Sequence, residues 1–310
     1  MEYLLLVGGF ILLIKGADFF VEGSASVAKK LRVSSMIIGL TVVAMGTSAP
    51  ECAVSISASF RGENAVAVSN VIGSNIFNLM MVCGICSVIS PLHVKAESLR
   101  KEFPLSILAA IALVAMGYMG MKIERIDGVI LLAAFIVFII WLVRSAKKQR
   151  NAQEDAEEIK TLGTVQCLVY IIGGIAAIVV GGDTVVNSAK TIADNFGLSP
   201  TLIGLTIVAM GTSLPELVTS IVAARKGETD MAIGNVIGSN LFNILLVLGA
   251  AGTISPIEVL MENVIDAIIL IGMSVVVWIF AWTGKKINRA EGAVMVALYA
   301  GYMGYICMRN

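Results

Sequence analysis

The chain has 310 residues, of which 57% are hydrophobic and 14% are charged. This apolar share exceeds that of a water-soluble fold of the same length, so the composition predicts a protein with several membrane-spanning segments. The 22 basic and 22 acidic residues balance one another and form no basic block, which argues against a nucleic-acid partner.

Ten apolar segments are each long enough, at roughly 20 residues, to cross a bilayer as a helix. In the first half of the chain they lie near residues 3–28, 35–60, 66–90, 103–121 and 126–143. In the second half they lie near residues 165–193, 200–224, 231–255, 262–283 and 290–308. The predicted fold is therefore an all-α polytopic membrane protein with ten transmembrane helices.

The first of these segments resembles a signal sequence in its apolar run. Glu2 replaces the usual basic start, however, and the segment has an internal counterpart near Gly181, so we expect it to be retained as the first helix. Lys15, Asp18 and Glu22 share one face of this helix, where a structural ion-pair role is expected.

The second half of the sequence repeats the first at a spacing of 165 residues. Between Gly39 and Asn78 this shift gives 25 identities in 40 positions. Two copies with an odd number of spans insert in opposite orientations, which is the inverted repeat of secondary transporters. The predicted domains are a first five-helix repeat at 1–144, a cytoplasmic linker at 145–164 and a second, inverted repeat at 165–310.

Lys and Arg are concentrated on one side of this predicted topology. The connections on that side hold 16 of them, and those on the other side hold 5. Because positively charged loops stay in the cytoplasm, the bias predicts a multi-pass cell-membrane protein with both termini outside the cytoplasm.

Two nearly identical motifs occupy corresponding helices of the two halves. GLTVVAMGTSAPE covers Gly39 to Glu51, and GLTIVAMGTSLPE covers Gly204 to Glu216. A proline removes one helical N–H and clashes with the carbonyl four residues earlier, so the second and seventh helices are predicted to break at these prolines, and the carbonyl of Ala44 should be loosened. Each glutamate then begins a new half-helix, facing the bare carbonyls of the preceding one. An ionisable residue beside unpaired backbone at membrane depth indicates a cation site, whereas a simple proline kink leaves both glutamates unexplained.

A polar stripe follows each proline motif. The two stripes contain the same residue types at four-residue spacing: Asn70, Ser74 and Asn78 in the first half, and Asn235, Ser239 and Asn243 in the second. Alone, such stripes indicate hydrogen-bonded packing between helices, with Gly73 and Gly238 allowing close approach. Their recurrence next to a carboxylate in both halves favours a role in ion binding.

The candidate ligands are all hard oxygen donors. They comprise the oxygens of both stripes, the carbonyls freed at the breaks, and the side chains of Glu51, Glu216, Thr47, Ser48, Thr212 and Ser213. Such donors suit Na⁺, Ca²⁺ or Mg²⁺, and a flexible cavity between broken helices favours Ca²⁺ over the strictly octahedral Mg²⁺. The single histidine has no partner ligands and the C-x-x-C at Cys83 lies in an apolar segment, so no cofactor is expected.

The paired G-T-S-x-P-E and G-S-N-x-F-N motifs, in two inverted five-helix halves, resemble the two α-repeats of the cation/Ca²⁺ exchanger superfamily, especially its prokaryotic Na⁺/Ca²⁺ exchangers. This resemblance implies that Ca²⁺ is held by Glu51 and Glu216 with the backbone oxygens of Thr47 and Thr212. It implies that Na⁺ uses the same glutamates with four serines and two carbonyls, those of Ser48, Ser74, Ser213, Ser239, Ala44 and Ala209. It places Asn78 and Asn243 at the central positions, and it implies that the first and sixth helices slide against the other eight.

The expected function is antiport of Na⁺ and Ca²⁺ by alternating access, without enzymatic activity, in a chain that works as a monomer in the lipid bilayer. Ca²⁺ export is expected to be electrogenic, because two carboxylates balance one Ca²⁺ or two Na⁺ and the ligands offer further Na⁺ positions. The alternative is a Ca²⁺/H⁺ antiporter in which Glu51 and Glu216 take up and release protons. A membrane hydrolase lacks a His or Lys base beside Ser48 or Ser213, and so many ligands would hold an ion too firmly for a channel.

Overall fold

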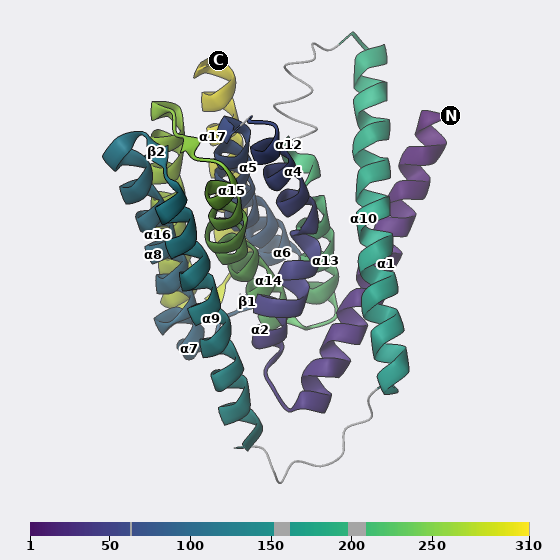
Figure 1. Cartoon of the computed structure of the whole chain (residues 1–310). Coiled ribbons are helices and arrows are strands. Elements are labelled where there is room, and N and C mark those ends of the chain that lie inside the picture. The colour runs from purple at the N-terminus through teal and green to yellow at the C-terminus, as the bar shows by residue number, and fades with distance from the viewer. Residues whose placement is uncertain (63, 152–161, 198–208, 310) are drawn as a thin grey trace.

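Helices that run in one common direction make up nearly all of the computed structural model (Figure 1). It describes residues 1–62, 64–151, 162–197 and 209–309. Within these residues, eight helical stretches are long and apolar enough to cross a membrane, and the bent pair Ser35–Thr47 with Ala49–Phe60 makes a ninth. The all-helical, multi-span prediction is confirmed. The predicted span at 200–224 begins outside the described residues, so the count of ten stays a prediction.

The helices of the first half are α1 (Glu2–Leu31), α2 (Ser35–Ile38), α3 (Ala44–Thr47), α4 (Ala49–Phe60), α5 (Asn64–Phe77), α6 (Cys83–Ile89), α7 (Ala96–Arg100), α8 (Glu102–Gly120) and α9 (Arg125–Asn151). Those of the second half are α10 (Thr164–Asn195), α12 (Ala209–Gly211), α13 (Leu214–Arg225), α14 (Thr229–Phe242), α15 (Gly249–Ile254), α16 (Met261–Gly284) and α17 (Arg289–Arg309). Three π-helical segments continue these helices: η1 (Gly39–Val43), η2 (Asn78–Val82) and η4 (Asn243–Leu248).

Two small antiparallel ribbons reveal how the halves are related. They pair β1 (Leu92–His93) with β4 (Lys286–Ile287), and β2 (Lys122–Ile123) with β3 (Ile257–Glu258). A shift of 165 residues takes β1 onto β3 and β2 onto β4, so the repeat exchanges one ribbon for the other. Because β1 precedes and β2 follows the long helix α8, the ribbons lie at opposite ends of the bundle. This arrangement is that of two repeats in opposite orientations.

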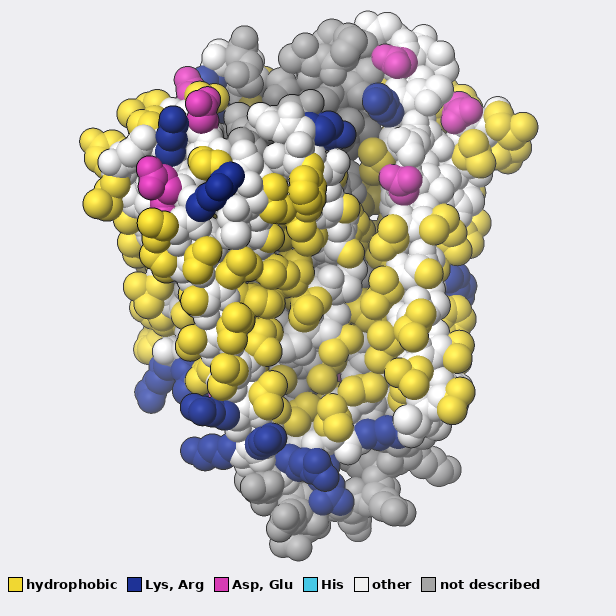
Figure 2. All heavy atoms as spheres, in the orientation of Figure 1, with side chains coloured by type: hydrophobic (Ala, Val, Ile, Leu, Met, Phe, Trp, Pro, Cys, Tyr) yellow, Lys and Arg dark blue, Asp and Glu magenta, His cyan; other side chains and the backbone are white. Residues whose placement is uncertain are grey.

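The charged residues divide the outer surface into two ends and an apolar band. Figure 2 shows hydrophobic side chains around the middle, Lys and Arg gathered at the lower end, and acidic and basic side chains mixed at the upper end. Both termini lie at the upper end (Figure 1). The basic end is therefore opposite the termini, in the sense that the positive-inside rule requires for extracytoplasmic termini.

The centre of the bundle is formed by the stretch Val66–Ile89 and the stretch Thr229–Ile254, which are mostly buried inside the protein. Helix α14 packs against α2, η1 and α3 of the first repeat. Its approach is close because a Cβ on Gly238 would lie 2.7 Å from the Leu40 Cα. The predicted role of Gly238 is confirmed; the segment related to Leu40 by the repeat lies outside the described residues, so the same role for Gly73 stays a prediction.

Helices α1 and α10 form an antiparallel pair at one side of the bundle (Figure 1). Glycines set their separation: a Cβ on Gly16 would lie 2.8 Å from the Ala177 Cβ, and one on Gly181 would lie 2.6 Å from the Leu13 nitrogen. Neighbouring backbone atoms cannot yield as a flexible side chain can. The two helices therefore touch along their backbones, and helix packing in membranes uses small residues in this way.

Substituting Gly16 with Ala should destabilise the protein by about 1–3 kcal/mol, the usual cost of overpacking a close contact. The measurement is the thermal unfolding midpoint of the purified protein in detergent. Gly8→Ala is the matched control, because the same helix has open space around a Cβ on Gly8. Equal midpoints for the two variants would contradict the proposed backbone contact.

Candidate functional site

Both predicted helix breaks are present at the proline motifs. The stretches Ser35–Thr47 and Ala49–Phe60 meet at an angle of 51°. At the breaks, Ser48 has φ −82° and ψ 10°, and Ser213 has φ −92° and ψ 7°, outside regular helical geometry. Each proline then stands in the first turn of the following helix, where its missing N–H and fixed φ are tolerated.

The backbone hydrogen bonds skip two carbonyls at the first break. The Ser48 N–H donates to the Ala44 carbonyl at 3.0 Å, and hydrogen bonding resumes where the Cys52 N–H donates to the Ser48 carbonyl at 3.1 Å. The carbonyls of Gly46 and Thr47 lie between these bonds, and Pro50 has no N–H to offer Gly46. The expectation that the Ala44 carbonyl is loosened is wrong, because the half-helix continues through Ser48; only its second lone pair is available to an ion. Of the predicted ligand Ala209, the structure describes the backbone but not the side chain.

The two breaks meet through crossed hydrogen bonds between their serines and glutamates. The Ser48 hydroxyl donates to Glu216 Oε1 at 2.7 Å, and the Ser213 hydroxyl donates to Glu51 Oε1 at 2.9 Å. Both glutamates are 0% exposed. Each break thus holds the carboxylate of the opposite repeat, and the two carboxylates lie in one buried site.

A set of buried side-chain oxygens around these glutamates has no hydrogen-bond partner in the described structure. Six of them form three repeat-related pairs: Glu51 Oε2 and Glu216 Oε2, Ser74 Oγ and Ser239 Oγ, and Asn78 Oδ1 and Asn243 Oδ1. A buried polar group without a partner costs about 1–3 kcal/mol. Six such atoms on predicted site residues therefore indicate a bound group that accepts oxygen ligands, which is a cation.

The chemistry of the set narrows the class of ion. Two carboxylates and neutral oxygens provide hard ligands with a formal charge of −2. The described residues contain no cluster of three or more His, Cys, Asp or Glu side chains that could hold a metal ion. Hard oxygen donors with few charges suit Na⁺ and Ca²⁺ and not transition metals.

The polar stripes divide into two parts with different contacts. At the start of each stripe, the Asn70 amide donates to Ser55 Oγ at 3.0 Å, and the Asn235 amide donates to Ser220 Oγ at 2.9 Å. These bonds brace the half-helices that carry the glutamates. The later residues of each stripe, a serine and an asparagine, carry the oxygens without partners.

The two threonines of the breaks differ in their surroundings. The Thr47 hydroxyl lies 3.1 Å from both the Val43 carbonyl and Asn235 Oδ1. The Thr212 hydroxyl is buried without a partner. Neither hydroxyl hydrogen-bonds to a glutamate, which fits the expectation that these threonines would contribute backbone oxygens.

Sequence reasoning missed two features of the site. The π-helical segments η2 and η4 begin at Asn78 and Asn243, and such wider turns are frequent at functional sites. The buried asparagines Asn75 and Asn240 hydrogen-bond across the interface between the repeats. They stand one residue after the stripe serines, off the four-residue spacing, although their identity in both halves was a usable signal.

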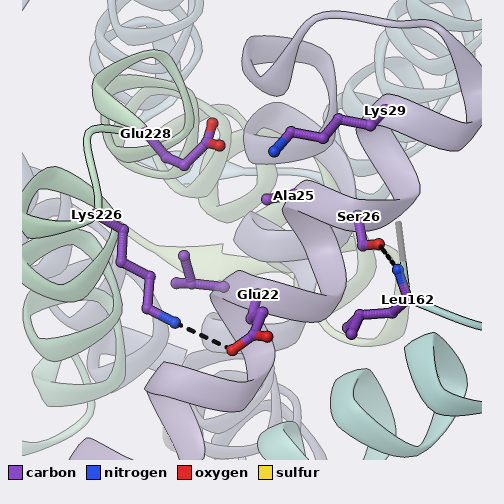
Figure 3. A pocket seen from close by; sticks show the side chains of 8 residues that line it. Glu22, Ala25, Ser26, Lys29, Leu162, Lys226 and Glu228 are labelled. Carbon is purple, nitrogen blue, oxygen red and sulfur yellow. Dashed lines mark hydrogen bonds and ion pairs between the residues drawn. The ribbon is translucent and has the colours of Figure 1, made fainter. Parts of the chain in front are cut away.

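A cavity of about 570 Å³ lies at the basic end of α1 (Figure 3). Lys226, in the turn after α13, reaches α1 there: its Nζ is 2.8 Å from Asp18 Oδ1 and 3.5 Å from Glu22 Oε2. Figure 3 shows Lys29 and Glu228 pointing toward one another across the cavity. The expected ion-pair role of Asp18 and Glu22 is confirmed, with a partner from the second repeat.

Comparison with known proteins identifies related sequences over the whole chain. The family described as sodium/calcium exchanger protein matches residues 1–144 and 167–308. The putative antiporter CaxA of Alkalimonas amylolytica is 38% identical over 308 residues, which cover 95% of each chain. The sodium/calcium exchanger MaX1 of Methanosarcina acetivorans is 36% identical over 342 residues, which cover 98% of this chain and 97% of the relative.

A solved structure has the same fold. The sodium-calcium exchanger NCX_Mj, soaked with zero Na⁺ and Ca²⁺, matches with a TM-score of 0.84 and 35% sequence identity. The match covers 98% of this chain and 99% of that chain. At this identity and coverage the likeness extends to the arrangement of both repeats.

Proposed function

This chain belongs to the sodium/calcium exchanger protein family, and from that premise we propose that it exchanges Na⁺ for Ca²⁺ across the cell membrane by alternating access. The observation that carries the proposal is the set of six partnerless oxygens beside two crossed glutamates. Two carboxylates neutralise one Ca²⁺, and the surrounding hydroxyl and amide oxygens replace its water. An exchanger of this kind moves ions without making or breaking a covalent bond.

The two ions compete for the same glutamates. Glu51 and Glu216 hold Ca²⁺ together with the backbone oxygens of Thr47 and Thr212. Na⁺ uses the glutamates with neutral oxygens on either side of them, from the serines of the breaks and stripes and the carbonyls of Ala44 and Ala209. Asn78 and Asn243 lie at the centre. Support for shared occupancy comes from the burial of the whole set, since one enclosed site of charge −2 cannot hold Ca²⁺ and two Na⁺ together.

Alternating access arises from movement of the α1 and α10 pair against the remaining helices. The pair is well suited to move as a unit, because its glycine contacts join the two helices to each other along their length. The ion pairs of Lys226 with Asp18 and Glu22 fasten α1 to the second repeat at the basic end. Breaking them frees α1 to move away from the cavity.

Replacing Lys226 with Gln should make the cavity more accessible from the basic end. Because these ion pairs are partly exposed, each is worth only about 1 kcal/mol or less, and we expect an effect of roughly two- to fivefold. The measurement is the rate at which a membrane-impermeant maleimide labels Ala25→Cys, in a protein whose native cysteines are replaced by Ala. Lys147→Gln, an exposed position at the same end, is the control. Identical rates in both variants would exclude a fastening role for Lys226.

The basic end of the molecule faces the cytoplasm, and both termini lie outside it. The asymmetry of Lys and Arg in Figure 2 supports this orientation. The chain works as a monomer surrounded by lipid, since the ion site is assembled from the two repeats of one chain. In this orientation Na⁺ entry drives the export of Ca²⁺ from the cell.

A second candidate is Ca²⁺/H⁺ antiport at the same glutamates. The observation in its favour is that each glutamate keeps one oxygen, Oε2, without a partner, so a proton could occupy it in place of the cation. The neutral Ser74 and Ser239 favour Na⁺ instead, because a hydroxyl oxygen is a ligand for Na⁺ and does not exchange a proton near neutral pH.

The test is Ca²⁺ uptake by proteoliposomes under an imposed Na⁺ gradient or an imposed pH gradient. We expect uptake with a Na⁺ gradient at equal pH on both sides, and no loss of it when a protonophore is added. Uptake that requires the pH gradient and ignores Na⁺ would overturn Na⁺ coupling and establish the second candidate.

A further inference from the structure

Asn75 and Asn240 form a symmetric bridge between the central helices α5 and α14. The Asn75 Nδ2 donates to the Asn240 backbone carbonyl at 3.2 Å, and the Asn240 Nδ2 donates to the Asn75 carbonyl at 3.2 Å. Both side chains are at most 1% exposed. Their amides therefore depend on these protein partners alone for their orientation.

The backbone contacts fix which way each amide points. A carbonyl can only accept a hydrogen bond, so the atom of Asn75 that meets the Asn240 carbonyl must be Nδ2 and not Oδ1. The Oδ1 of Asn75 then points away and requires a donor. Asn243 supplies one, since its Nδ2 lies 3.1 Å from Asn75 Oδ1. In the related half, Asn78 Nδ2 lies 3.3 Å from Asn240 Oδ1.

This chain of bonds determines what the ion site contains. Because Asn243 spends its Nδ2 on Asn75, its Oδ1 is the atom left buried without a partner, and the same holds for Asn78. If either amide were reversed, an N–H₂ group would take the place of that oxygen. A donor group there would repel a cation, whereas an oxygen binds it.

We propose that Asn75 and Asn240 are positioning residues of the ion site, an inference that rests on the proposed cation transport. Each acts across the repeat boundary: Asn75 holds the amide of Asn243, and Asn240 holds that of Asn78. Neither supplies an atom to the ion. Their contribution is to exclude the reversed amide, which otherwise competes because a free asparagine turns its oxygen and nitrogen about with little change in shape.

A double-mutant cycle tests this role, with Ca²⁺ titration calorimetry of the purified protein as the readout. Asn75→Ala should weaken Ca²⁺ binding by roughly ten- to a hundredfold, the range for a hydrogen-bonding contact with a charge. Asn243→Asp has two equivalent oxygens, so its orientation no longer matters. In that background Asn75→Ala should change the affinity by less than about twofold, or improve it, because Asn75 Oδ1 would otherwise face a carboxylate oxygen.

Asn70→Ala is the matched control, since Asn70 braces the helix of Glu51 through Ser55 and does not touch Asn243. Its effect should be the same in both backgrounds, because distant sites act additively. The pair Asn240→Ala and Asn78→Asp repeats the cycle in the other half. Equal losses from Asn75→Ala in both backgrounds, or no loss in the wild-type background, would overturn the proposal.

The calorimetric readout keeps this inference separate from the proposed function. A protein that binds Ca²⁺ but shows no Na⁺-driven flux would contradict the proposed exchange while the cycle still decides the role of Asn75. Conversely, normal Na⁺-driven flux with an additive cycle would overturn the positioning role alone. Thermal unfolding midpoints of all variants identify any loss of affinity that comes from a lost fold.

Discussion

Replacing Glu51 with Gln should abolish Ca²⁺ transport, and replacing Glu216 with Gln should do the same. The change keeps the volume of the side chain but removes one of the two charges that balance a divalent ion in a fully buried site. Leaving a buried charge without its partner costs about 3–5 kcal/mol, so Ca²⁺ affinity should fall by roughly a hundred- to a thousandfold. The measurement is Na⁺-driven uptake of radioactive Ca²⁺ into proteoliposomes.

The matched control for these variants is Glu262→Gln, in the exposed first turn of α16. It removes the same charge from the surface and should leave uptake close to that of the wild type. Near-normal Ca²⁺ uptake by both Glu51→Gln and Glu216→Gln would remove the proposed site.

Exchange should also depend strongly on membrane potential. If a further Na⁺ binds beyond the two that balance Glu51 and Glu216, the Na⁺-loaded protein is positive and the Ca²⁺-loaded protein is neutral, so each cycle moves one charge. Moving one charge through 100 mV is worth about 2.3 kcal/mol, which shifts the limiting Ca²⁺ gradient by about 50-fold. The neutral side chains of Asn78 and Asn243 fit this expectation, because a carboxylate there would absorb the extra charge.

The measurement is Na⁺-driven Ca²⁺ flux in proteoliposomes whose potential is clamped with K⁺ and valinomycin. Exchange of Ca²⁺ for Ca²⁺ under the same clamps is the control, since it moves no net charge and its equilibrium should ignore the potential. A Na⁺-driven flux that is indifferent to the clamped potential would mean that exchange is electroneutral.

The features that could be predicted from the sequence are those set by local chemistry or by the repeat. The breaks follow from Pro50 and Pro215, because a missing N–H acts on its own helix wherever that helix lies. The inverted arrangement follows from a repeat with an odd number of spans. Both outcomes need no knowledge of which helices touch.

The crossed bonds of the site could not be predicted in the same way. Ser48 stands three residues before Glu51, yet its hydroxyl donates to Glu216 of the other repeat. Such a partner becomes evident only when the two breaks are brought together in space. Sequence reasoning placed both residues in the site but had no means to pair them.

The π-helical turns explain a second limit of the sequence prediction. A stripe at four-residue spacing assumes a regular helix, but η2 and η4 begin at the last asparagine of each stripe and change the period there. The same assumption set aside Asn75 and Asn240. The Ala44 carbonyl shows the limit at the backbone level, because where a half-helix ends depends on its last hydrogen bond as well as on the proline that follows.

The crossing of serine and glutamate between the halves bears on how such a chain could have arisen. A single repeat carries one carboxylate, and the serine that would hold it stands on a repeat of opposite orientation. An ancestral protein of one repeat could therefore complete this site only as a pair of identical chains inserted in both directions. After gene duplication and fusion, a change in either motif alters the half-site of the other, so the two motifs evolve under a common constraint. The 25 identities in 40 positions between Gly39 and Asn78 and their counterparts are the trace that this constraint leaves in the sequence.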